Sequence, residues 1–304
     1  MDLQYNVMFP MRAVKHWQRW SEGASLGEVA KAVESAGFQG FSMSEHPFPD
    51  NQWLANGGHH AFDPFVSLSF AAAATTRLRL MTYILVSGYR SPYLTAKAAA
   101  SFDLLSGGRF TLGTGAGYLK TEFEALGADF HRRGALLDEA IVAWKATWAG
   151  EEHHGPEFGI TDHVALPLPA TAGGPPVWIG GNSKAAQRRV VDTADGWIPM
   201  GQSAETAAIT RTPPLEDIAR LAELISGVNQ RRSELGRAPA DVSFVPFEAA
   251  RLVSGDSGDF VESVKPRLNE YADAGVTWIT VEPASRSFSD FRTDIELIAG
   301  ELIS

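Results

Sequence analysis

Residues 92–117 read PYLTAKAAASFDLLSGGRFTLGTGAG, and this stretch holds one helix, its stop and the strand that follows. Ser91 offers a capping oxygen ahead of Pro92, which suits the first position of a helix because its missing N–H costs nothing there. Gly107 follows the helical run as a left-handed terminator. The apolar run Arg109–Gly113 then leads into glycines that end at Gly117. The stretch therefore predicts a helix, a sharp stop and a buried strand.

The same unit recurs along the whole chain. Eight β-rich runs are expected as strands, at Leu3–Phe9, Gly40–Ser44, Leu78–Val86, Arg109–Gly113, Val177–Gly180, Gly196–Met200, Val242–Ala249 and Val276–Val281. Helical patterns follow them at 26–36, 63–75, 92–105, 132–148, 183–193, 214–235, 259–274 and 288–302. Eight such units predict an α/β fold, a (β/α)8 TIM barrel, with chemistry on the loops after the strands. The alternative is a doubly wound open sheet.

One segment interrupts the alternation of strands and helices. Residues 151–176 are rich in turn-forming residues and are expected to be an insertion before the fifth strand, with a small hairpin. No flexible linker divides the chain, so we expect residues 1–304 to form a single domain.

Composition excludes several classes of protein. The 304 residues include no Cys, which excludes disulfides and thiolate chemistry. A net charge of −10 argues against binding to nucleic acid or to an anionic membrane surface. Residues 1–10 lack the pattern of a signal peptide, and a cytoplasmic location is expected.

Polar and glycine residues gather where the second and fourth strands end. Glu45 and His46 follow the second strand, where an imidazole could transfer a proton and a neighbouring carboxylate could fix its tautomer. The fourth strand runs into Gly113, Gly115 and Gly117, then Tyr118, a turn that would let a ligand approach the backbone. A loop-capping histidine and an ordinary tight turn are the alternatives.

The fifth strand ends in a pattern suited to an anion. Gly180, Gly181, Asn182 and Ser183 lead into a helix that carries Lys184 and Arg188, and exposed N–H groups at a helix start attract phosphate. A plain helix cap would explain Asn182 or Ser183 equally well. The adjacent pairs His59-His60 and His153-His154 do not match a metal-binding pattern, and no metal is expected.

These stretches together resemble the bacterial luciferase-like monooxygenase superfamily of flavin- and deazaflavin-dependent barrels. The matching residues, which span 26–200, include Ser44-Glu45-His46, Asp63-Pro64-Phe65, Arg90-Ser91-Pro92, Leu105-Ser106-Gly107-Gly108-Arg109, Leu112 to Gly117, Glu122-Phe123-Glu124-Ala125-Leu126-Gly127 and Pro175 to Gly181. The last third of the chain agrees only in its alternation of strands and helices.

The resemblance implies roles for individual residues. The cofactor ring would lie near His46, and a non-proline cis peptide at Tyr83-Ile84 would support the face of the ring. The glycines of the fourth strand would border the cofactor, and residues 180–183 would bind its phosphate. Lys184 and Arg188 would meet the acidic tail of coenzyme F420.

The resemblance also implies an activity. The stretches 80–92 and 105–127 look most like the deazaflavin branch, which favours F420 and hydride transfer to or from a small organic substrate, with His46 or Tyr118 handling the proton. The alternatives are a two-component FMN-dependent monooxygenase that uses O2, and an idle barrel that only binds a ligand. A homodimer is expected, and a separate flavin or F420 reductase could supply reduced cofactor. The sequence does not identify the substrate.

Overall fold

A computed structural model describes residues 3–303 of the chain. Its strands are β1 (Gln4–Met8), β2 (Gly40–Met43), β3 (Arg79–Thr82), β4 (Leu85–Val86), β5 (Phe110–Gly115), β6 (Val177–Gly180), β7 (Gly196–Ile198), β8 (Asp241–Phe244) and β9 (Trp278–Val281). Every pairing between neighbouring strands is parallel, in the order β3-β2-β1-β9-β8-β7-β6-β5-β4. A further pairing of β3 with β5 closes the sheet into a barrel, which excludes the open-sheet alternative.

The barrel has eight strand positions, because β3 and β4 are two pieces of one predicted strand. The strand breaks at Tyr83-Ile84, where the peptide bond is cis, as the family resemblance implied. Both pieces pair with β5, through Leu80 and Met81 before the break and through Leu85 and Val86 after it.

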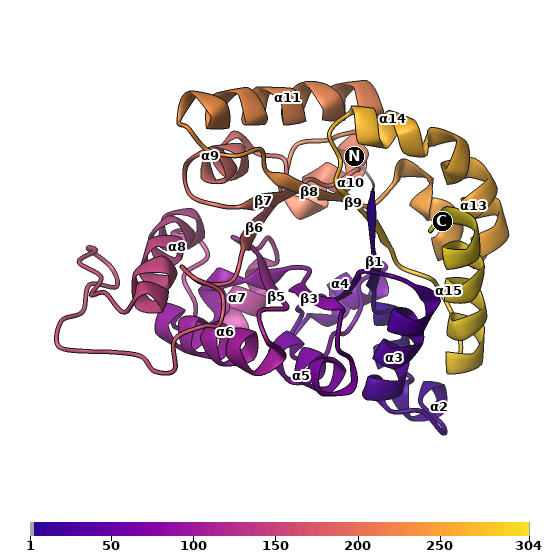
Figure 1. Cartoon of the computed structure of the whole chain (residues 1–304), viewed down its shortest axis with the longest axis horizontal. Helices are drawn as coiled ribbons and strands as arrows, with labels where there is room; N and C mark the ends of the chain where they lie inside the picture. The colour runs from indigo at the N-terminus through magenta and orange to yellow at the C-terminus, as the bar shows by residue number, and fades with distance from the viewer. Residues whose placement is uncertain (1–2, 304) are drawn as a thin grey trace.

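An outer ring of helices surrounds the strands (Figure 1). These helices are α3 (Leu26–Ala36), α5 (Pro64–Ala74), α6 (Pro92–Ser106), α8 (Arg133–Ala149), α9 (Lys184–Asp192), α11 (Ile218–Glu234), α13 (Ser257–Val264), α14 (Leu268–Asp273) and α15 (Phe288–Leu302). The predicted stop is confirmed at Gly107, whose φ of 72° lies in the left-handed region. The single helix predicted over 259–274 is instead two helices, because Pro266 lacks the N–H that a continuous helix needs.

Short helices in the loops after the strands were not predicted. They are α1 (Met11–Val14), α2 (Trp17–Trp20), α4 (Asn51–Ala55), α7 (Lys120–Ala125), α10 (Ala204–Thr210) and α12 (Ala250–Val253). Segments of four to seven residues are too short to show helical periodicity. The predicted strand Val242–Ala249 was likewise too long, since β8 ends at Phe244 and a 3-10 turn covers Phe247–Ala249.

The insertion at 151–176 contains no hairpin, which corrects the prediction. One antiparallel bridge joins His153 to Ile160, and the rest is irregular chain that extends beside α8 in Figure 1. Prolines at 156, 167, 169, 175 and 176 cannot donate to a strand ladder. The segment is held by side chains instead, as where the Thr171 N–H donates to Asp103 Oδ2 over 2.7 Å.

Polar side chains form a connected layer inside the barrel. Asn6 Nδ2 donates to Ser42 Oγ at 2.9 Å and to Thr280 Oγ1 at 3.1 Å, and Thr280 lies 2.9 Å from Ser243 Oγ. All four residues are fully buried. Since buried polar groups need partners, this layer fixes the side chains of four strands relative to one another. Among the described residues, no helix is both long and apolar enough to cross a membrane.

Candidate functional site

His46 lies just beyond β2 and is held by a carboxylate from another loop. Its Nδ1 is 3.0 Å from Oε2 of Glu122, at the start of α7. Glu122 is fully buried, and it also accepts the N–H of Phe48 at 3.1 Å and the hydroxyl of Tyr89 at 2.8 Å. Three donors converge on one carboxylate, so the orientation of the imidazole is fixed by the fold.

Glu45, which we predicted to orient His46, has other partners. Glu45 accepts the N–H of Val86 at 2.6 Å and forms an ion pair with Arg90. Burial raises the pKa of Glu45, and the Arg90 charge opposes that rise. Successive residues of an extended chain point to opposite sides, which explains why Glu45 turns toward β4 while His46 faces Glu122. Glu122 therefore takes the orienting role that we predicted for Glu45.

Aromatic rings enclose His46. Ring centroids lie 4.4 Å away for Trp53, 5.0 Å for His59 and 6.1 Å for Tyr118. Burial lowers the pKa of His59 to about 4, with a further contribution from His46. Burial and the Glu122 charge raise the pKa of Tyr118 to about 12. Near neutral pH the site therefore presents a neutral imidazole at residue 59 and a neutral phenol at residue 118.

The broken third strand fills the space between two of the predicted glycines. A Cβ on Gly115 or on Gly180 would lie 2.6 Å from Cδ1 of Ile84, so both glycines make room for this side chain. The Tyr83 side chain points the other way, with its hydroxyl 3.1 Å from Ser243 Oγ in the polar layer of the barrel. Ile84 is thus the apolar surface between the ends of β5 and β6.

The other two glycines predicted after the fourth strand meet structural requirements. A Cβ on Gly113 would lie 2.1 Å from the carbonyl oxygen of Thr82. Gly117 has a φ of 82°, and a Cβ there would crowd Val86 and Phe123. His46, Gly115 and Gly180 all lie at the carboxyl ends of parallel strands, as predicted, so they share one face of the barrel.

The turn after β6 differs from the anion site expected there. The N–H of Gly181 donates to Ile198 O, and that of Asn182 donates to Thr212 Oγ1 at 2.7 Å. The Asn182 amide donates to the carbonyls of Met200 and Pro213 and accepts the N–H of Met200. These N–H groups and the Asn182 side chain are therefore engaged within the protein, which differs from the role of phosphate ligands that we expected for them.

What remains for an anion is the first turn of α9. The Ser183 hydroxyl caps the helix by accepting the N–H of Ala186 at 3.1 Å, and Lys184 is exposed. Arg188 forms an ion pair with Asp138 of α8 at 2.7 Å, together with Arg189. Asp138 therefore binds Arg188 and partly compensates its charge, whereas no ion pair within residues 3–303 involves Lys184.

Two arginines supply positive charge here, Arg133, which matches the family pattern but was given no role in the sequence analysis, and Arg211, which was not singled out. Arg133 donates to the carbonyl of Gly117 at 3.0 Å, and its guanidinium lies 3.9 Å from the ring centroid of Phe130. Arg211 lies 5.3 Å from the same centroid and has a φ of 54°, which is uncommon for a residue other than glycine. Burial and the Arg211 charge lower the pKa of Arg133.

Neither arginine is neutralised. Within residues 3–303 no ion pair involves Arg133 or Arg211. Arg211 precedes Thr212, which binds the Asn182 N–H, so both guanidiniums lie between the turns after β5 and β6. Such a pair of like charges suits an anionic group. The left-handed backbone conformation of Arg211 cannot be predicted from the sequence, because it depends on the surrounding fold.

The described residues contain no cluster of His, Cys, Asp and Glu that could hold a metal ion. His153 instead lies 3.1 Å from Oε1 of Glu139, which also accepts N–H groups from Glu157 and Phe158. This histidine therefore helps to attach the insertion to α8.

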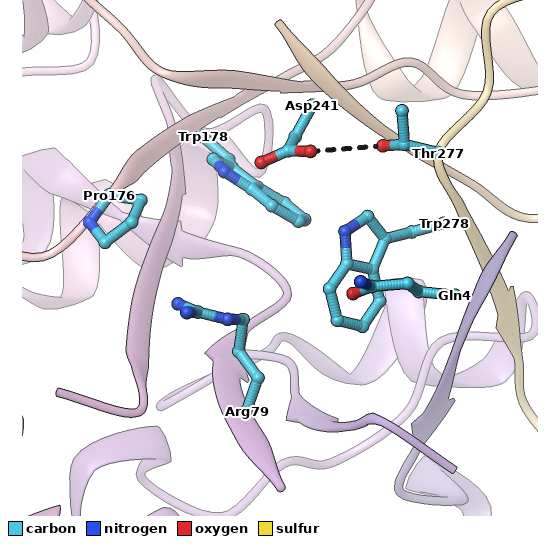
Figure 2. Close-up of a pocket in the computed structure, with 7 residues that line it drawn as sticks. All are labelled: Gln4, Arg79, Pro176, Trp178, Asp241, Thr277 and Trp278. Atoms are coloured by element: carbon cyan, nitrogen blue, oxygen red, sulfur yellow. Dashed lines mark hydrogen bonds between the residues drawn. The ribbon is translucent and has the colours of Figure 1, made fainter. Parts of the chain in front are cut away.

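A hollow of about 360 Å³ lies at the opposite end of the barrel, where the strands begin (Figure 2). The rings of Trp178 and Trp278 meet edge to face in it, with centroids 5.9 Å apart. Asp241 accepts a hydrogen bond from Thr277, and Arg79 donates to Thr111 Oγ1 at 2.9 Å. In TIM barrels this end serves stability and not catalysis, so the hollow is separate from the site around His46.

Comparison with known proteins identifies the family. A family model described as luciferase-like monooxygenase matches residues 7–264. The chain belongs to this family. A relative in Mycobacterium tuberculosis, called an uncharacterised protein, is 32% identical over 267 residues, which cover 83% of each chain.

Two similar proteins are named for different cofactors. The FMNH(2)-dependent dimethylsulfone monooxygenase of Pseudomonas putida is 30% identical over 184 residues, covering 59% of this chain and 49% of that protein. The coenzyme F420-dependent tetrahydromethanopterin reductase of Methanopyrus kandleri has the same fold, with a TM-score of 0.73 at 16% identity, covering 100% of this chain and 99% of that chain. The proteins similar to this chain thus include enzymes named for each of the two cofactors.

Proposed function

We propose that the protein is an oxidoreductase that binds coenzyme F420 and transfers a hydride between it and a small organic substrate. The cofactor ring would lie over Ile84 beside His46, where the apolar side chain supports one face. When bound, the deazaflavin supplies hydride transfer at C5 of its ring. Tyr118, whose pKa is about 12, would hold a proton at its hydroxyl, and the enclosing rings would exclude water.

One observation carries the choice of F420. Arg133, Arg211 and Lys184 place three cationic side chains near the turns after β5 and β6, and within the described residues neither arginine has an acidic partner. FMN ends at a single phosphate, whereas F420 continues into an acidic glutamate tail. Two unpaired guanidiniums and a lysine fit a chain of several anionic groups better than they fit one phosphate.

The proposal is tested by replacing the two arginines. The double variant Arg133→Gln/Arg211→Gln should raise the Kd for F420 about tenfold and raise that for FMN much less, because fewer contacts to FMN are lost. Arg188→Gln is the matched control, since this arginine already binds Asp138. Equal losses of F420 and FMN binding would show that the arginines do not recognise the tail.

The FMN-dependent monooxygenase is the second candidate. The 30% identity to the FMNH(2)-dependent enzyme favours it, and the enclosed rings around His46 would serve that chemistry equally. Tighter binding of FMN than of F420 by the unmodified protein would select it, with a separate reductase as the source of reduced flavin.

A further inference from the structure

A second cavity, of about 440 Å³, opens at the carboxyl end of the barrel. Its walls come from the loop after β1, the loop between α12 and α13, and the loop between β9 and α15. The order of strands places β1 and β9 across the barrel from β5 and β6. The cavity is therefore remote from the pair Arg133 and Arg211, although both lie on the same face.

The lining of this cavity is strongly cationic. Three arginines, Arg12, Arg19 and Arg286, contribute to it beside His16, on a chain whose net charge is −10. No ion pair within residues 3–303 involves any of these four side chains. Many other arginines of the chain, such as Arg189 and Arg267, do have acidic partners. The carboxylate of Glu282, which accepts the N–H of Met11, lies near Arg12, so the excess positive charge around the hollow comes from Arg19 and Arg286 and suits an anionic ligand.

The floor of the cavity is rigid. Trp20 is buried, with its indole N–H donating to the carbonyl of Ser285 at 3.3 Å, and its ring packs against Phe9 and Phe291. Ser285 in turn donates to Asp294 at 2.6 Å, which ties the β9–α15 loop to the long helix. The loop that carries Arg286 is therefore held in place before any ligand arrives, which lowers the entropic cost of binding.

The cavity and the candidate site lie on neighbouring loops, because Arg12 follows β1, His46 follows β2, and these two strands pair with each other. The charge of Arg12 is among the groups that lower the pKa of His59, although burial is the larger cause, and the ring of His59 lies 5.0 Å from that of His46. A molecule whose reactive end reached His46 could therefore place another part of itself among the arginines.

We propose that this cavity binds the anionic group, a carboxylate or a phosphate, of the substrate. This inference rests on the proposed oxidoreductase function, because it takes the ring site beside His46 as the place of reaction. Arg12, Arg19 and Arg286 would hold the anion by charge-assisted hydrogen bonds, and the opposite side of the barrel mouth would remain free for the cofactor.

The test uses a signal from the cavity itself. The indole N–H of Trp20 lies at the floor, and its resonance can be followed in protein labelled with 15N-tryptophan and assigned with Trp20→Phe. Titration with inorganic phosphate, and separately with succinate, at low ionic strength should shift this resonance to saturation. The double variant Arg19→Gln/Arg286→Gln should raise the Kd about tenfold or more. The control Arg220→Gln/Arg231→Gln, which alters two exposed arginines of α11, should leave the Kd unchanged.

Saturation by phosphate alone would assign a phosphorylated substrate, and saturation by succinate alone a carboxylate. No shift with either anion, or equal Kd values in both double variants, would overturn the proposal. F420 titrations of the same proteins separate failure of this inference from failure of the proposed function. If only this inference is wrong, the unmodified protein still binds F420 although neither anion shifts the Trp20 resonance. Anion binding without cofactor binding would instead refute the proposed function and leave the anion site standing.

Discussion

Nδ1 of His46 lies 3.0 Å from Oε2 of Glu122, a fully buried carboxylate 76 residues further along the chain. A carboxylate oxygen accepts hydrogen bonds, so this contact places a proton on Nδ1 of His46 and turns Nε2 away from Glu122. The two side chains come from the loops after β2 and β5, and their contact fixes the imidazole at the carboxyl end of the barrel.

Replacing Glu122 should change the tautomer of His46. In 15N spectra of histidine-labelled protein, the unmodified chain should show the Nδ1–H form, and Glu122→Gln should increase the Nε2–H form. Because the Gln amide cannot satisfy three donors, the free energy of unfolding should also fall by about 1–3 kcal/mol. Glu124→Gln, at an exposed position of the same helix, should change neither quantity. A dominant Nε2–H form in the unmodified protein would refute the assigned contact.

The packing of Ile84 against Gly115 can be measured by a double-mutant cycle. Gly115→Ala should cost about 1–3 kcal/mol of unfolding free energy, because its Cβ would lie 2.6 Å from Cδ1 of Ile84. In an Ile84→Ala background the same substitution should cost at least about 1 kcal/mol less.

Gly113→Ala provides the contrast for that cycle. Its Cβ would meet the Thr82 carbonyl at 2.1 Å, and backbone cannot move aside as a side chain can. The cost of Gly113→Ala should therefore stay the same when Ile84 is shortened. Additive costs for Gly115 and Ile84 in urea unfolding would show that these two residues do not compete for space.

His59 should make the protein less stable in mild acid. Its pKa is lowered from the ordinary 6.5 to about 4, so between these values the unfolded chain binds a proton that the folded chain excludes. The free energy of unfolding should therefore decrease as the pH falls from about 6.5 to about 4, by up to about 3 kcal/mol from this group. Urea unfolding across this range should show a shallower dependence on pH for His59→Gln. His163→Gln, at an exposed position, should keep the original slope, and an unchanged slope for His59→Gln would contradict the account.

Local sequence predicted the barrel well because each β/α unit carries its own signals. Pro92 and Gly107 mark both ends of α6, and the same alternation of strand and helix repeats around the closed sheet. The candidate site was only partly predictable. His46 could be found from its position after a strand, but Glu122 acquires its role from a contact that no local pattern encodes.

Three-dimensional contacts also decided which candidates remain free to bind. Asn182 looked like a phosphate ligand, yet its amide is used by Met200 and Pro213. Arg188 looked available and is paired with Asp138. The unpaired Arg133 and Arg211 come together only because α8 and the loop after β7 both reach Phe130.

The central claim is that this barrel binds F420 beside His46, and side-by-side equilibrium titrations of the purified protein with F420 and with FMN test it most directly. The account predicts saturable binding of one F420 per chain, with a Kd about tenfold or more below that for FMN. Binding of FMN as tight as or tighter than that of F420, or no saturable binding of either, would contradict it.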